Sequence, residues 1–206
     1  MECIFRNTEM QIYQLNISAL SAEEYKNAFY DMSEERRKKC LDFRFDEDKK
    51  RCIAADFLIR TVLAERLYKE KNEIEIYTDD NGKPFVNEDI CFNLSHSGNF
   101  VVAVVADKCV GIDIEKIKQV KVNMLDYFCS QNDIKYILGE EENNDEYVPL
   151  SALERFFEVW TFKEAFLKCT GEGISKKAAH INFNDYDKYL KTFDDYVICV
   201  YMEHKR

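Results

Sequence analysis

The order of predicted elements repeats once along the 206-residue chain, and this repetition constrains the fold more than any other feature. The first half predicts a strand at 11–17, a helix with a capping box of Ser21 and Glu24, a long helix at 46–70, and strands near Ile74, Ile90 and Val102. The second half predicts a strand at 110–114, helical segments within 124–138, a long helix at 151–168, and strands near Ile181 and at 196–202. We therefore expect an α+β fold of two pseudo-symmetric halves, residues 1–106 and 107–206.

Local signals mark where several of these elements begin and end. They are turns at Asn81-Gly82 and Ser97-Gly98-Asn99, a capping box of Ser151 and Glu154, a helix stop at Gly171, and a solvated polar loop at 139–147. The second turn precedes the apolar run 100–105, which favours a strand at that point. The halves are expected to join near Asp107 and Lys108.

Composition excludes several classes of protein. A hydrophobic content of 46% is ample for a core, and the eight scattered cysteines form no C-x-x-C pair, so we expect reduced and mostly buried thiols. The N-terminus lacks a signal pattern, and the longest apolar run, 100–106, is too short to span a membrane. A net charge of −10 argues against a nucleic-acid partner. We expect a cytoplasmic monomer with no membrane association.

The segment GIDIE at 111–115 alternates apolar and acidic residues. On a strand, Asp113 and Glu115 would project from the same face, about 7 Å apart at their Cα atoms. Such a pair suits Mg²⁺, which is commonly held by one or two carboxylates together with substrate phosphate. The alternative is a strand with a solvated acidic face, and the pattern alone does not exclude it.

The predicted helix that contains 156–168 carries two charges among apolar residues. Glu164 projects between Trp160 and Phe157, and Lys163 lies on an aliphatic face. Such charges need partners, because an unpaired buried charge costs several kcal/mol. The alternative for Glu164 is an i,i+4 ion pair with Lys168, worth roughly 0.2–0.5 kcal/mol.

Two further segments have a polar composition that would allow them to bind an anion. The residues 93–98 are interpreted as a turn between two strands, which would place Ser95 and His96 at a loop tip beside exposed backbone N–H groups. The residues 34–39 form the densest basic cluster of this acidic chain. The alternatives are a solvent-exposed histidine and a solvated helix face.

Three segments, in this order, resemble the signatures of the surfactin-synthetase-activating (Sfp-like) 4'-phosphopantetheinyl transferases. They are NLSHS at 93–97, GIDIE at 111–115 and WTFKEAFLK at 160–168. The resemblance extends over about 32–174. It implies two pseudo-symmetric α+β halves with the active site between them, where coenzyme A binds. The first half would hold the adenine and the 3'-phosphate, and the second would hold the metal and face the carrier protein.

The resemblance also implies roles for individual residues. The predicted Mg²⁺ ligands are Asp113, Glu115 and Glu164, and the predicted catalytic residues are Glu164, Lys168 and His96. The residues predicted to bind coenzyme A are Arg36, Lys39, Lys83, Pro84, Phe85, Ser95, His96, Asp113 and Lys168. Of these, Ser95 and His96 would meet the 3'-phosphate, and 83–85 would line the adenine. The carrier would bind beside 118–136, where the alternative for the apolar side chains is core packing.

The implied reaction transfers 4'-phosphopantetheine from coenzyme A to a serine of an apo acyl, aryl or peptidyl carrier protein. It depends on Mg²⁺ and releases 3',5'-adenosine bisphosphate, and it would serve fatty acid, polyketide or nonribosomal peptide synthesis. A Mg²⁺-dependent nucleotide pyrophosphatase and a non-catalytic module that binds coenzyme A or a carrier are the alternatives. The first would release phosphopantetheine without a carrier, and the second would show no turnover.

Overall fold

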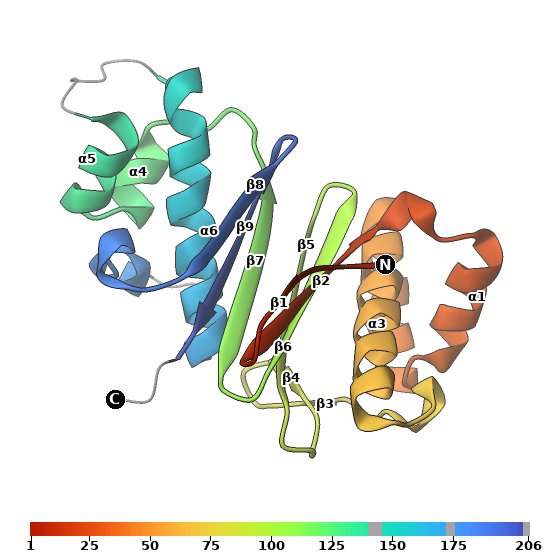
Figure 1. Cartoon of the computed structure of the whole chain (residues 1–206). Coiled ribbons are helices and arrows are strands. Elements are labelled where there is room, and N and C mark those ends of the chain that lie inside the picture. The colour runs from red at the N-terminus through yellow and green to blue at the C-terminus, as the bar shows by residue number, and fades with distance from the viewer. Residues whose placement is uncertain (140–145, 172–175, 204–206) are drawn as a thin grey trace. The chain divides into compact units, whose positions relative to one another are not determined.

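The computed structural model describes residues 1–139, 146–171 and 176–203 (Figure 1). The chain divides into two compact units, Met1–Lys108 and Cys109–Arg206, and each combines helices with antiparallel sheet, so the fold is α+β. Most of the polar loop expected at 139–147 lies outside the described residues. In the described part of the chain, no helix is both long and apolar enough to cross a membrane.

A four-stranded antiparallel sheet forms the centre of the first unit. Its order is β1 (Glu2–Arg6), β2 (Met10–Asn16), β6 (Phe100–Ala106) and β5 (Cys91–Ser97). The long helix α3 (Asp46–Leu67) packs on one face and buries its apolar side chains against β2, β5 and β6 (Figure 1). The pairing of β5 and β6 on either side of Gly98 confirms the predicted turn, and Gly98 has the positive φ of 53° that a tight hairpin requires.

Two shorter helices precede α3. Helix α1 (Ala22–Asp31) begins with the predicted capping box, in which Ser21 and Glu24 satisfy each other's backbone N–H groups. Helix α2 (Glu34–Leu41) contains the basic cluster and begins at Ser33, whose hydroxyl accepts from the N–H of Arg36. Both caps satisfy backbone donors that would otherwise lack a partner at the helix starts.

A two-stranded ribbon of β3 (Tyr77–Thr78) and β4 (Pro84–Phe85) stands apart from this sheet, with the predicted turn at Gly82 between its strands. The strand expected near Ile74 begins three residues later, as β3, and Ile74 itself is not part of it. Ile74 follows the 3-10 turn η2 (Lys71–Glu73) and is buried in the core as a single anchor, so its apolar character reflects burial without strand pairing. The N-terminal strand β1 had no prediction, because its side chains are mostly exposed and show no clear alternation.

The second unit has a three-stranded antiparallel sheet in the order β7 (Val110–Lys116), β9 (Tyr196–Met202) and β8 (Tyr189–Phe193). Helix α6 (Leu153–Thr170) packs against β7 and β9 and ends at Gly171, which is left-handed as predicted. Figure 1 shows α4 (Asn123–Phe128) and α5 (Gln131–Leu138) beside α6.

Two predictions for the second unit are wrong. Ser151 does not cap α6, because it lies in the 3-10 turn η3 (Leu150–Ala152) that Pro149 introduces, and α6 begins without a side-chain cap. Ile181 is not in a strand. It follows the 3-10 turn η4 (Lys176–His180), precedes η5 (Phe183–Asp185), and packs against the helical core near Phe128. Ser151 thus lies inside a 3-10 turn, and Ile181 lies between two of them, where short local patterns had indicated a helix cap and a strand.

Candidate functional site

Strand β7 presents its acidic face to helix α6 at unusually short range. Side chains alternate along the strand, so Gly111, Asp113 and Glu115 share one face. A Cβ atom on Gly111 would lie 2.0 Å from the carbonyl oxygen of Ala165 and 2.6 Å from the backbone nitrogen of Cys169, both on α6. The absence of a side chain at Gly111 therefore lets the helix lie directly against the acidic face of the strand.

Lys168 on α6 reaches across to β7. Its ammonium lies 2.7 Å from Oδ1 of Asp113 and donates to the carbonyl oxygen of Ile112 at 3.2 Å. Asp113 is 4% exposed, so this ion pair is largely desolvated on the carboxylate side. Lys168 thus pairs with the strand, where the sequence had also allowed an ion pair with Glu164 on its own helix.

Glu164 is the least satisfied acid of the cluster. Its side chain is buried, and Oε1 has no hydrogen-bond partner among the residues that the structure describes. Burial is the largest cause that raises the pKa of Glu164 to about 7, the negative charges of Asp113 and Glu115 raise it further, and Lys168 opposes them. The three predicted carboxylates are therefore close enough to interact electrostatically.

This donor set fits a hard cation in its chemistry. Carboxylate oxygens are what Mg²⁺ prefers, and a buried oxygen without a donor is a site that a cation would satisfy. Over the described residues, however, no three His, Cys, Asp or Glu side chains converge as a group ready to hold a metal. The assignment of Asp113, Glu115 and Glu164 as metal ligands therefore stays a prediction.

Lys163 lies away from this acidic cluster. It is fully buried, its ammonium lies 2.6 Å from Asp133 at the start of α5, and it donates to the carbonyl oxygen of Phe128 at 2.9 Å. Asp133 also accepts from the backbone of Ser130 and Phe183. The charge that the helix pattern placed on an aliphatic face is thus fully paired, and it connects α6 to the corner between α4 and α5.

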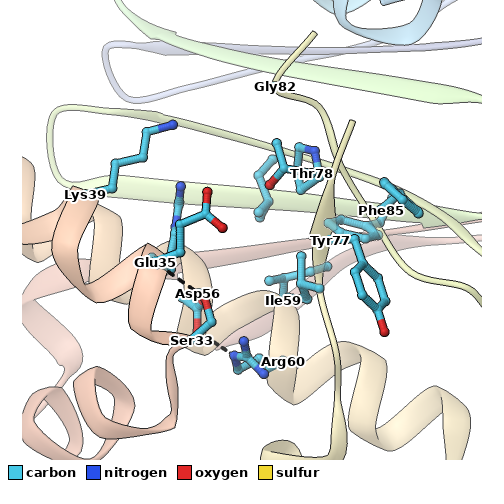
Figure 2. Close-up of a pocket in the computed structure, with 15 residues that line it drawn as sticks. Ser33, Glu35, Lys39, Asp56, Ile59, Arg60, Tyr77, Thr78, Gly82 and Phe85 are labelled. Carbon is cyan, nitrogen blue, oxygen red and sulfur yellow. Dashed lines mark hydrogen bonds and ion pairs between the residues drawn. The ribbon is translucent and has the colours of Figure 1, made fainter. Parts of the chain in front are cut away.

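A pocket of about 490 Å³ in the first unit contains several of the predicted binding residues (Figure 2). Arg36 and Lys39 line it from α2, and Pro84 and Phe85 line it from the ribbon. Figure 2 shows Lys39 on the opposite side from Tyr77 and Phe85, whose rings are 5.6 Å apart. The pocket thus combines charged groups from α2, the cations Arg36 and Lys39 and the acid Glu35, with an aromatic wall on the side of Tyr77 and Phe85.

The predicted residues Lys83, Ser95 and His96 are not among those that line this pocket. The interpretation of 93–98 as a turn is also wrong, because Ser95 and His96 lie within β5 and pair with Val102 and Val101. The strand continues to the two-residue hairpin, so only Gly98 and Asn99 turn. Alternation places exposed His96 on the same face of β5 as Phe92 and Leu94, which do line the pocket.

Sequence reasoning missed the side of the pocket that α3 provides. Asp56 and Arg60 line the pocket, are each 5% exposed, and form an ion pair of 2.6 Å. Their spacing of four residues within an otherwise apolar stretch, from Cys52 to Ala64, was a visible signal, since buried charges are rare unless they are paired.

Comparisons with known proteins identify the family of the chain. A family model for the N-terminal part of 4'-phosphopantetheinyl transferases matches residues 19–109, and the 4'-phosphopantetheinyl transferase superfamily matches 109–201. The chain is 31% identical over 169 residues to the 4'-phosphopantetheinyl transferase Sfp of Bacillus subtilis, covering 81% of this chain and 72% of the relative. The chain belongs to the 4'-phosphopantetheinyl transferase family.

Two other relatives show how widely this transferase family extends. The 4'-phosphopantetheinyl transferase psf-1 of Bacillus pumilus is 34% identical over 172 residues, covering 81% of the chain and 71% of the relative. The L-aminoadipate-semialdehyde dehydrogenase-phosphopantetheinyl transferase of Rattus norvegicus is 28% identical over 176 residues, with 80% and 56% covered. The predicted Sfp-like type is confirmed, and the chain is an enzyme, a 4'-phosphopantetheinyl transferase.

Proposed function

We propose that this enzyme, acting as a cytoplasmic monomer, transfers 4'-phosphopantetheine from coenzyme A to a serine of an apo carrier protein and releases 3',5'-adenosine bisphosphate. The observation that carries the proposal is the cluster of Asp113, Glu115, Glu164 and Lys168, which the contact of β7 with α6 assembles in the second unit. It places buried carboxylates and one ammonium together, as a reaction between charged phosphates requires.

The pocket of the first unit supports the nucleotide part of this proposal. The Phe85 and Tyr77 side chains expose apolar ring surface on which an adenine can stack, while Arg36 and Lys39 supply positive charge for a phosphate. In this proposal His96, on the same face of β5 as two lining residues, adds a contact to the 3'-phosphate, and Lys83 lines the adenine side with Pro84 and Phe85. Ser95 is buried on the opposite face of β5, and its contact with the 3'-phosphate stays a prediction. The two pseudo-symmetric halves with an active site between them remain a prediction.

The chain's own residues would supply charge balance and a proton acceptor. The carrier serine attacks the β-phosphorus of coenzyme A, the bond to the bridging oxygen of the nucleotide breaks, and the serine proton must leave. Glu164 is the proposed acceptor, because its buried Oε1 has no donor to compete with that proton among the described residues. Lys168 would offset the negative charge on the leaving phosphate, which requires that it share or exchange its contact with Asp113.

Mg²⁺ would be held by Asp113, Glu115 and Glu164, and when bound it would neutralise and orient the pyrophosphate. Without a cation these three acids repel one another, which is the physical reason to expect one. Asp113→Ala should accordingly abolish transfer at ordinary Mg²⁺ concentrations while the protein stays folded. A variant that retained full activity would exclude Asp113 from the site.

The proposed carrier surface at 118–136 is smaller than its sequence indicates. Leu125 and Phe128 are buried in the core, so core packing accounts for them. Tyr127 is 51% exposed and remains available for an apolar contact. Lys121 lies 2.9 Å from Glu146, an exposed pair that a partner's carboxylate can replace at little cost.

The intact mass of apo carrier proteins tests the proposal directly. Carriers from fatty acid, polyketide and peptide synthesis would be incubated separately with coenzyme A, Mg²⁺ and the enzyme. We expect each true substrate to gain the mass of one phosphopantetheine group, with equimolar 3',5'-adenosine bisphosphate. Release of free phosphopantetheine without a carrier would instead indicate a pyrophosphatase, and binding without any turnover would indicate a binding module.

A further inference from the structure

The aromatic wall of the pocket in the first unit is formed by a ribbon that is too small to be stable by itself. The ribbon of β3 and β4 contains two residue pairs, Tyr77 with Phe85 and Thr78 with Pro84, and it is separate from the four-stranded sheet. An isolated two-stranded ribbon is marginally stable in water. The shape of the pocket therefore depends on how the chain next to this ribbon is attached to the rest of the unit.

Ile74 and Val86 attach the chain on either side of the ribbon to the apolar core, and Arg60 adds a polar attachment. Its Nε donates to Oδ2 of Asp56 at 2.6 Å, and its Nη1 donates to the carbonyl oxygen of Ile74, three residues before β3 begins. A longer contact of 3.5 Å reaches the carbonyl oxygen of Lys71. The guanidinium thus bridges α3 and the segment 71–76 that leads into the aromatic wall.

We propose that Arg60 is a positioning residue for the nucleotide pocket, that Asp56 orients it, and that together they hold the β3–β4 wall where a base can bind. This inference rests on the proposed function of the pocket. The guanidinium has a rigid planar fork, so a single side chain can bind a carboxylate and a carbonyl in fixed directions, whereas the ammonium of lysine cannot reproduce that geometry.

The effect of the buried ion pair on the position of the ribbon can be tested separately from its effect on the stability of the fold. Burial raises the pKa of Asp56, and the guanidinium of Arg60 lowers it, so desolvation offsets much of the attraction between the two groups. Replacing a buried ion pair with apolar residues of similar volume is often neutral or stabilising. A variant without either charge can therefore be as stable as the wild type and still lack the attachment to Ile74.

Two variants and a matched control test the inference. Arg60→Lys keeps the charge opposite Asp56 but loses the fork, and the double variant Asp56→Leu with Arg60→Met removes both charges. Arg66→Lys is the control, because Arg66 lies on the same helix and pairs with Asp107 at the surface, 2.6 Å away. Hydrogen exchange at the amides of 74–78 and the dissociation constant of 3',5'-adenosine bisphosphate are measured on each intact protein, with KM and kcat for coenzyme A.

Both variants should exchange the amides of 74–78 at least tenfold faster, bind the nucleotide about tenfold more weakly, and raise KM for coenzyme A with little change in kcat. The control should match the wild type in all four measurements. Unchanged exchange at 74–78, or faster exchange with unchanged nucleotide affinity, would overturn the positioning role. A wild type that fails to bind the nucleotide would instead refute the proposed function of the pocket. Arg60→Lys decides the question even if the double variant does not fold.

Discussion

At the scale of single residues, the proposed chemistry of the second unit depends most on the buried acid Glu164. Its carboxyl has an oxygen without a donor among the described residues, and two other acids raise its pKa together with burial. An ionised Glu164 is therefore unfavourable in the metal-free protein. A cation bound beside the carboxylate of Glu164 stabilises its ionised form, and a proton bound to it removes the unfavourable charge.

A first prediction follows for the stability of the metal-free enzyme. The pKa of Glu164 rises from 4.5 to about 7 on folding, so the folded state holds more protons than the unfolded state between these values, and stability falls as pH rises through them. The cost above pH 7 is on the order of 3 kcal/mol. Glu164→Gln should therefore raise Tm at pH 8 and leave it nearly unchanged at pH 4.5, as measured by thermal unfolding in chelator.

Exposed Glu154 on the same helix offers the control, and Glu154→Gln should show no such dependence on pH. A rise in Tm for Glu164→Gln that was equal at both pH values would mean that the ionised carboxylate carries no penalty in the fold.

A second prediction separates two roles of Glu164 in catalysis. Glutamine keeps an acceptor oxygen but has no useful basicity, so loss of a proton acceptor should lower kcat by about 10²–10⁴-fold at any Mg²⁺ concentration. We expect that loss for Glu164→Gln. For Glu115→Gln, which would alter a metal ligand alone, we expect that raised Mg²⁺ recovers much of the rate. Full recovery of Glu164→Gln in a Mg²⁺ titration would exclude Glu164 as the base.

At the scale of elements, the close contact of β7 with α6 sets the distance between the two parts of the acidic cluster. Gly111→Ala would place a methyl group inside contact distance of the α6 backbone, which cannot move aside as a side chain can. We expect a loss of about 3 kcal/mol of stability, at the upper end for overpacking, together with weaker Mg²⁺ binding. Chemical denaturation and calorimetric titration with Mg²⁺ would measure the two effects.

Gly171→Ala is the matched control at the end of the same helix. Gly171 has a φ of 75°, and a Cβ atom there would meet no other atom within 4 Å, so alanine strains the backbone without touching β7. It should lower stability by about 1 kcal/mol and leave Mg²⁺ affinity unchanged. Equal Mg²⁺ affinity in Gly111→Ala would show that the cluster does not depend on this contact.

At the scale of the whole molecule, the candidate sites divide between the two units. The pocket belongs to Met1–Lys108, and the acidic cluster belongs to Cys109–Arg206. We expect 3',5'-adenosine bisphosphate alone to slow hydrogen exchange around α2 and the β3–β4 ribbon, and Mg²⁺ alone to slow it in β7 and α6. The reverse distribution, measured by mass spectrometry on peptides of the intact enzyme, would contradict both assignments.

The sequence by itself determined the elements whose signals are local and repeated. The capping box at Ser21, the turn at Gly98 and the stop at Gly171 were all predicted, because each depends on the conformational preferences of a few neighbouring residues. Asp113 and Glu115 were placed on one face of a strand by alternation alone, and the structure keeps them there.

Only the tertiary structure decided which charges meet. Lys163 and Lys168 are five residues apart on one helix, yet Lys163 pairs with Asp133 inside the core and Lys168 pairs with Asp113 at the acidic cluster. Arg60 likewise pairs with Asp56 on its own helix and also donates to the carbonyl oxygen of Ile74, a contact that its place on the helix did not predict. Periodicity assigns a side chain to a face of its own element, but its partner lies on another element, which long-range packing brings within hydrogen-bond distance.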